Sequence, residues 1–126
     1  MTDILLVDDS ELARFLLRQI LVTEGHTIVG EAGDGEECIR KVRELAPQMV
    51  ILDLIMPKMR GIETLKEIRA IDPAVKVVIC SGDHQEFSVR DAVKFGASGY
   101  IIKPFSKVAV LEEVRDIMNE AASNEG

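Results

Sequence analysis

The sequence is poor in several features that would each have indicated a class of protein. Its 126 residues include only two cysteines, too few for the disulfide framework of a small secreted domain. No apolar run approaches the roughly 20 residues that a transmembrane helix needs. No basic segment precedes the first apolar run, as it would in a signal peptide. We therefore expect a cytoplasmic protein without a membrane span.

Positive charge is also scarce. The chain has 15 Lys and Arg against 22 Asp and Glu, which gives a formal net charge of −7. Direct binding to nucleic acid is not expected, because it needs a basic surface. Cys80 lies inside an apolar run and is expected to be a buried hydrophobic residue. His26 and His84 stand alone in the sequence, so neither is expected to bind a metal.

Five short apolar runs, rich in valine and isoleucine, recur along the chain. They are continuously apolar rather than alternating, which is typical of strands buried on both faces of a sheet. These predicted strands cover residues 4–7, 27–32, 49–52, 76–81 and 99–102. Apolar residues at helical spacing predict five helices: between Ser10 and Gly25, 36–46, from Gly61 towards Pro73, 85–95 and 107–122. The last four residues are expected to fray.

Strands that alternate with helices predict an α/β fold with a parallel sheet covered on both faces. Right-handed crossovers make it doubly wound, a (βα)5 arrangement of flavodoxin-like type with strand order 2-1-3-4-5. We expect one domain spanning residues 1–126, without an output domain. The first helix is expected to have one broad apolar face, made by Leu12, Leu16 and Ile20 with Ala13, Leu17 and Leu21.

Polar residues follow four of the five predicted strands. Asp8 and Asp9 follow the first, Asp53 the third, Ser81 ends the fourth and Lys103 follows the fifth. In a parallel sheet these ends share one edge, where α/β proteins bind ligands. Three carboxylates without Cys or His suit Mg²⁺ or Mn²⁺, and the lysine and hydroxyl suit a phosphoryl group. The pattern predicts a phosphoryl-handling site.

Each of these residues also has an ordinary explanation. A single aspartate at a strand end is usually a cap or a loop residue, and one of Asp8 and Asp9 could cap the helix near Ser10. A single lysine or serine there carries almost no information. The coincidence of four strand ends with complementary chemistry at one edge favours the functional interpretation.

Four motifs carry a resemblance to a known family. They are LLVDDS (5–10), VILDLIMPKMRG (50–61), VVICSG (77–82) and YIIKPF (100–105). Together they resemble the receiver domain of two-component response regulators, over essentially the whole chain. The sequence is most similar to stand-alone, CheY-like chemotaxis regulators and to single-domain phosphorelay carriers.

The resemblance implies a role for each matching residue. Asp53 would accept a phosphoryl group from a sensor histidine kinase. Asp9, Asp53 and the backbone carbonyl of Ile55 would hold Mg²⁺, with Asp8 acting mainly through bound water. Ser81 would bond the phosphoryl group, and Lys103 would pair with it.

The resemblance also implies how the signal leaves the site. Ser81 and Tyr100 would act as the switch, and the Lys103–Pro104 peptide would be cis. A downstream protein, either a motor switch protein or a phosphotransfer protein, would bind the face made by the fourth helix, fifth strand and fifth helix. A phosphatase is a further possible partner. Three positions depart from the common pattern: Ser81 replaces Thr, Ile55 replaces the frequent Asn, and Arg60 replaces a small or acidic residue.

The preferred function is a phosphorylation-activated regulator that acts by phosphorylation-dependent protein binding in chemotaxis. It would catalyse only its own phosphorylation and dephosphorylation, and so would not be an enzyme in the usual sense. A phosphorelay carrier is the nearest alternative. A Mg²⁺-dependent aspartyl phosphohydrolase of the haloacid dehalogenase type is less favoured, because its DxD signature is missing. A pseudo-receiver scaffold also ranks low, because all the expected acid, hydroxyl and lysine positions are filled.

Overall fold

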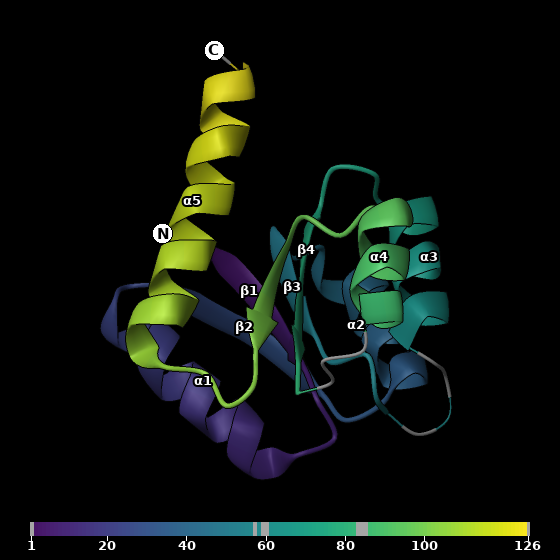
Figure 1. Cartoon of the computed structure of the whole chain (residues 1–126), viewed down its shortest axis with the longest axis horizontal. Helices are drawn as coiled ribbons and strands as arrows, with labels where there is room; N and C mark the ends of the chain where they lie inside the picture. Colours follow the sequence, from purple (N-terminus) through teal and green to yellow (C-terminus); the bar gives the residue numbers. More distant parts are fainter. Residues whose placement is uncertain (1, 57, 59–60, 83–85, 126) are drawn as a thin grey trace.

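A five-stranded parallel sheet forms the centre of the protein (Figure 1). The computed structural model describes residues 2–56, 58, 61–82 and 86–125. The strands are β1 (Asp3–Val7), β2 (Thr27–Ala32), β3 (Met49–Leu52), β4 (Lys76–Ser81) and β5 (Gly99–Ile102). Their order is β2-β1-β3-β4-β5, which confirms the predicted topology.

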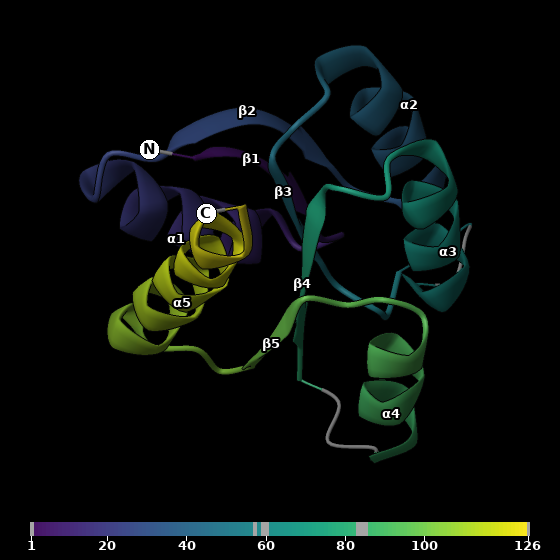
Figure 2. The same ribbon diagram turned by 90° about the horizontal axis from the view of Figure 1, so that it is seen from above.

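Five helices cover the two faces of this sheet. They are α1 (Glu11–Thr23), α2 (Gly35–Leu45), α3 (Gly61–Ile71), α4 (Glu86–Lys94) and α5 (Lys107–Glu125). Helices α1 and α5 lie on one face, and α2, α3 and α4 on the other (Figures 1 and 2). In the described part of the chain, no helix combines the length and the apolarity that crossing a membrane would demand.

The predicted helix boundaries hold to within about two residues, except at the end of α5. This helix continues to Glu125, so the prediction of a frayed tail was wrong for residues 123–125. The reason lies in the sequence, which has no Gly or Pro between Lys107 and Glu125 to end the helix. Gln85, the predicted start of the fourth helix, lies outside the described residues.

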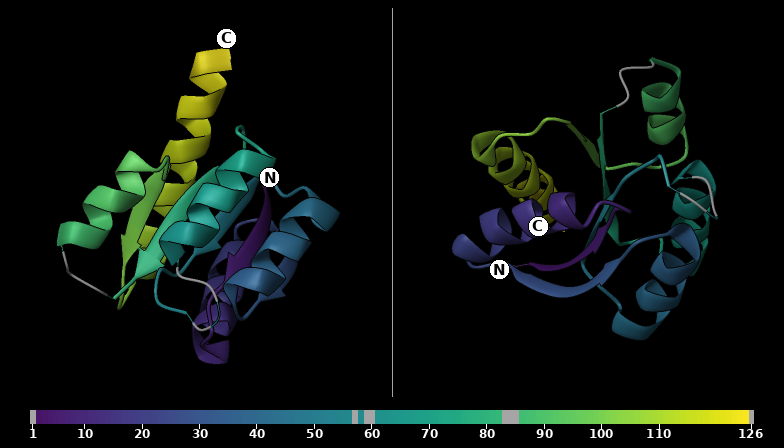
Figure 3. Two further views of the ribbon diagram at one scale, coloured as in Figure 1. Left: turned by 90° about the vertical axis from the view of Figure 1, so that its right-hand side faces the viewer. Right: turned by 90° about the horizontal axis from the view of Figure 1, so that it is seen from below.

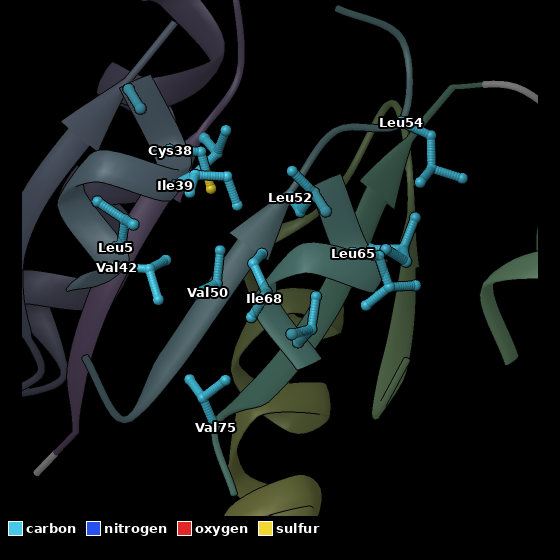
Figure 4. Close-up of a cluster of buried hydrophobic side chains, with 14 of the residues drawn as sticks. Leu5, Cys38, Ile39, Val42, Val50, Leu52, Leu54, Leu65, Ile68 and Val75 are labelled. Atoms are coloured by element: carbon cyan, nitrogen blue, oxygen red, sulfur yellow. The ribbon is translucent and has the colours of Figure 1, made fainter. Parts of the chain in front are cut away.

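The core consists of two layers, one on each side of the sheet. Side chains that alternate along β3 illustrate this: Val50 and Leu52 pack under α2, α3 and α4 (Figure 4), whereas Met49 and Ile51 pack under α1 and α5. All four are essentially inaccessible to solvent. Burial of each such side chain contributes roughly 1.5–3 kcal/mol, so the central strands form a firm base for the residues that follow them.

Helix α1 departs from the prediction on one side. Leu17 and Leu21 are buried as expected, but Leu12 is 66% and Leu16 43% exposed. The helix contacts the sheet and α5 over a narrower stripe than its sequence offers. Part of the broad apolar face that the sequence predicts is therefore exposed to solvent.

Candidate functional site: an acid pocket at the carboxyl edge of the sheet

Three carboxylates meet where β1 and β3 end. The parallel strands all point towards one edge (Figure 3), and β1 and β3 are direct neighbours in the sheet. One oxygen from each of Asp8, Asp9 and Asp53 can be chosen so that all three lie within 4.8 Å of one another. Asp8 and Asp53 are only 2% and 6% exposed, whereas Asp9 is exposed. The prediction that these residues come together is confirmed.

Lys103 reaches this acid pocket from the far side of β4. Its Nζ donates to Asp8 Oδ2 at 2.6 Å and to Asp53 Oδ2 at 3.3 Å. Its backbone N–H donates to the carbonyl of Ser81 at 3.0 Å, which extends the β4–β5 ladder by one residue. The Lys103–Pro104 peptide is cis, as the family resemblance implied.

Burial and charge shift the proton affinities of two groups in the pocket. Burial raises the pKa of Asp53, and the charge of Asp8 acts in the same direction. The bond from the Ile55 N–H and the charge of Lys103 oppose this rise only in part. Burial lowers the pKa of Lys103, but the bond to Asp8 and the charge of Asp53 outweigh it, so that pKa is raised overall. Lys103 therefore keeps its charge, while ionised Asp53 is costly without further positive charge.

The three carboxylates differ in their hydrogen-bond partners. Asp8 accepts the Ser10 N–H at its Oδ1 (2.9 Å) and Lys103 at its Oδ2. Asp53 accepts the Ile55 N–H at its Oδ1 (3.0 Å) and Lys103 at its Oδ2. The Asp9 carboxylate makes no hydrogen bond or ion pair with any residue that the structure describes. A set of oxygen donors with one open carboxylate suits a hard divalent cation such as Mg²⁺ or Mn²⁺.

A tight backbone contact joins Leu54, the residue after Asp53, to the start of α3. The Gly61 N–H donates to the Leu54 carbonyl at 3.1 Å. A Cβ at position 61 would lie 2.3 Å from Leu54 Cα, so only glycine fits there. Ile55, which lies between them in the sequence, is 61% exposed beside Asp53.

The two predicted switch residues lie on β4 and β5. Ser81 is fully buried at the end of β4. Tyr100, on β5, is half-buried and packs against the cluster beneath α2, α3 and α4. Arg60, one of the three departures from the common pattern, lies outside the described residues.

Sequence reasoning missed two residues beside the pocket. Arg14 donates from Nε to Glu31 Oε1 (3.0 Å) and from a terminal nitrogen to the backbone carbonyl of Asp8 (2.5 Å). Glu31 also accepts from Arg18. A signal was present: Glu31 is the only charged residue in the predicted strand TIVGEA, where a charge needs a partner.

Comparisons with known proteins agree with this architecture. Residues 4–115 match the family described as response regulator receiver domain. The chemotaxis protein CheY of Thermotoga maritima is 40% identical over 114 residues, which are 90% of this chain and 95% of that protein. The protein CcdB of Bacillus subtilis is 39% identical over 118 residues, 94% of this chain and 98% of that one.

A solved structure is similar over nearly the whole chain. The CheX–CheY–BeF3–Mg²⁺ complex from Borrelia burgdorferi contains a chain that is 35% identical, with a TM-score of 0.90, and the match covers 93% of this chain and 89% of that one. The chain therefore belongs to the receiver-domain family of response regulators, which are generally non-catalytic, and is closely related to CheY chemotaxis proteins.

Proposed function

We propose that this receiver is activated when Asp53 accepts a phosphoryl group from a sensor histidine kinase. The observation that carries the proposal is the arrangement around Asp53. A buried carboxylate contacts a lysine that also bonds Asp8, and Asp9, whose carboxylate has no partner among the described residues, lies within reach. This arrangement has both the nucleophile and the positive charge that phosphoryl transfer needs.

The same residues fit a divalent cation. Asp9, Asp53 and the backbone carbonyl of Ile55 would hold Mg²⁺, or Mn²⁺ in its place, with Asp8 acting mainly through bound water. When bound, the ion supplies positive charge that neutralises the equatorial oxygens of the transferring group. Asp9 is the natural principal ligand, because Asp8 and Asp53 already bond Lys103 and backbone N–H groups.

The chain's own residues have defined parts in the transfer. A carboxylate oxygen of Asp53 forms the new O–P bond as the N–P bond of the phosphohistidine breaks. The electron pair goes to the imidazole nitrogen. Lys103, 3.3 Å from Asp53, then pairs with the phosphoryl oxygens instead of the carboxylate. The buried Ser81 hydroxyl donates to a phosphoryl oxygen. The product is a mixed anhydride that later hydrolyses, so the chain catalyses only its own modification and is not an enzyme that turns over a separate substrate.

The proposed output is a protein partner bound by α4, β5 and α5, which follow one another along one side of the molecule (Figure 2). Val93, Ile102 and Val108 are exposed on these three elements. Exposed apolar side chains from neighbouring elements favour protein binding. The Borrelia structure is a complex of a CheY with CheX, which supports a protein partner for this chain as well.

A direct experiment would test the phosphorylation. The protein is mixed with MgCl₂ and acetyl phosphate and analysed by intact-mass and peptide mass spectrometry. One added phosphoryl group on Asp53 is expected. Asp53→Asn should lose it while keeping its circular dichroism spectrum, and excess EDTA should prevent it in the wild type. Equal labelling of the Asn variant would refute the assignment of Asp53.

The physiological setting we propose is chemotaxis, with a motor switch protein as target and a phosphatase as a further partner. A phosphorelay carrier is the second candidate. It is favoured by the fact that a relative of nearly the same identity, CcdB, is not named as a chemotaxis protein. Transfer of the phosphoryl group from Asp53 onward to a histidine of a phosphotransfer protein would identify the carrier. Tighter binding to a motor switch protein after phosphorylation would identify the chemotaxis regulator.

A further inference from the structure

Asp9 has an unusual place among the three acids of the pocket. Its carboxylate is exposed and has no hydrogen-bond partner among the described residues, so none of those residues holds the carboxylate in position directly. The position of that carboxylate therefore depends on the main chain that carries it. In particular, it depends on the orientation of the peptide group that joins Asp8 to Asp9.

Three hydrogen bonds hold this peptide group and the atoms beside it. The Asp8 N–H donates to the Ala32 carbonyl at 3.0 Å, and the Ser10 N–H donates to Asp8 Oδ1 at 2.9 Å. The Asp8 carbonyl, which belongs to the Asp8–Asp9 peptide itself, accepts from Arg14 at 2.5 Å. Of these contacts, only the last is supplied by a side chain from outside the loop.

Arg14 is itself closely constrained. It lies in the first turn of α1, where its N–H donates to the Ser10 carbonyl. Its side chain is only 17% exposed, and its Nε donates to Glu31 Oε1 on β2. A Cβ on Gly33 would lie 3.7 Å from its terminal nitrogen, so the guanidinium is also in contact range of the β2–α2 loop. A planar guanidinium held at two of its nitrogens has a defined orientation.

We infer that Arg14 is a positioning residue for the cation site, oriented by Glu31 and acting on Asp9 through the Asp8 carbonyl. The inference rests on the proposed function, because it assumes that Asp9 is a metal ligand. Contacts behind the ligands commonly set metal affinity, and their loss costs about 10–100-fold. The charge of Arg14 cannot be the reason for such an effect, since a positive group beside the site repels a cation.

This opposition between geometry and charge gives a sharp test. Removal of a positive charge should by itself tighten Mg²⁺ binding, whereas loss of the bond to Asp8 should weaken it. Arg18 provides the matched control, because it lies on the same helix and bonds the same Glu31 without a bond to Asp8. Mg²⁺ dissociation constants are measured by NMR titration of the backbone amides with MgCl₂, on the unphosphorylated protein and at a temperature where every variant is folded.

Arg14→Gln is expected to bind Mg²⁺ about tenfold more weakly than wild type. Arg18→Gln is expected to bind it as tightly as wild type or more tightly. Arg14→Lys keeps the charge, but a lysine lacks the planar guanidinium that bonds both Glu31 and the Asp8 carbonyl. It should therefore also weaken Mg²⁺ binding, by less than Arg14→Gln does. The amide shift of Asp9 should change in both Arg14 variants, which a general loss of stability would not cause.

Unchanged or tighter Mg²⁺ binding by folded Arg14→Gln would overturn the inference and leave the proposed function intact. If Arg14→Gln does not give the spectrum of a folded protein, Arg14→Lys decides in the same way. Wild-type protein that shows no Mg²⁺-dependent shifts at all would overturn the metal site itself, and the inference with it.

Discussion

The acid pocket and the output surface, defined as the exposed side chains of Val93, Ile102 and Val108, are built in opposite ways. In the pocket, two buried carboxylates share one lysine and accept backbone N–H groups. On the output surface, the three apolar side chains are 67%, 52% and 63% exposed. The side chains of Asp8, Asp53 and Lys103 are thus held in position by contacts within the chain itself. The output surface would gain about 25 cal/mol for each Å² of apolar area that a partner covers, which is why we propose a protein partner there.

The two regions are joined at the ends of β4 and β5. The Lys103 N–H bonds the Ser81 carbonyl, while the Lys103 ammonium lies in the pocket. Ile102, the residue before Lys103, belongs to the output surface. A change in the partner of Lys103 can thus favour one arrangement of β5 over another. Such a change would be a population shift driven by contacts at the pocket, and it is the mechanism that we propose for the switch.

The largest expected effect is in the pocket. Asp9→Ala removes the pocket carboxylate that has no hydrogen-bond or ion-pair partner among the described residues, so Mg²⁺ binding should weaken by about a hundredfold, or roughly 2.7 kcal/mol. Phosphorylation by acetyl phosphate at low Mg²⁺ should slow in parallel. NMR titration with MgCl₂ measures the affinity. An affinity within a factor of two of wild type would show that Asp8 and Asp53 suffice and that Asp9 is a surface residue.

Lys103→Ala should abolish the coupling between the acid pocket and the output surface. Without the ammonium, Asp8 and Asp53 lose a shared cation, so Mg²⁺ should bind as tightly as before or more tightly, and phosphorylation should persist. The gain in partner affinity on phosphorylation, expected at about 1–3 kcal/mol in the wild type, should disappear. Calorimetry with and without beryllofluoride measures this gain. Lys107→Ala, which removes an exposed lysine of α5, is the control for lost charge. If the gain in partner affinity persists in Lys103→Ala, Lys103 is not part of the switch.

A smaller effect is expected on the output surface alone. Val108→Asp places a charge where a partner would cover an apolar side chain, so partner affinity should fall by about tenfold while phosphorylation stays normal. Val22→Asp is the matched control, since Val22 is comparably exposed on α1, outside the output surface. Equal losses in both variants would mean that the partner does not bind through α4, β5 and α5.

The fold and most of the pocket could be predicted because they follow from strong local signals. Continuous apolar runs specify buried parallel strands, and the residue after each run necessarily falls at the carboxyl edge. Asp8, Asp53 and Lys103 were placed by this argument alone. Their common position in space needs only the strand order, which the right-handed crossover rule restricts.

Other features depend on contacts that no short stretch of sequence contains. Arg14 has an ordinary position in a helix, and only the approach of β2 to α1 gives it Glu31 as a partner. The exposure of Leu12 likewise depends on how α1 is rotated against the sheet and α5. Helical spacing fixes which residues share a face, but the width of the buried stripe is set by the neighbouring elements. The prediction for the end of α5 rested on the tendency of chain termini to fray, whereas no Gly or Pro ends this helix before Glu125.

The smallest expected effect concerns the lifetime of the phosphorylated state. Hydrolysis requires a water molecule to approach phosphorus opposite the Asp53 oxygen. Ile55 follows Asp53 by two residues, bonds its carboxylate through the backbone N–H, and exposes most of its side chain beside it. That side chain cannot hydrogen-bond a water, and we expect it to occupy space near the line of attack. Because positioning is most of what phosphoryl-transfer catalysis requires, a polar amide at this position should speed hydrolysis. We expect Ile55→Asn to lose its phosphoryl group faster than wild type, by up to about tenfold, or 1.4 kcal/mol in the barrier.

Both proteins are phosphorylated with acetyl phosphate, transferred to the same buffer with Mg²⁺, and followed by intact-mass spectrometry. Ile55→Val, which stays apolar, is the control and should decay like wild type. Decay of the Asn variant that is unchanged or slower would show that Ile55 does not control the access of water to the phosphoryl group.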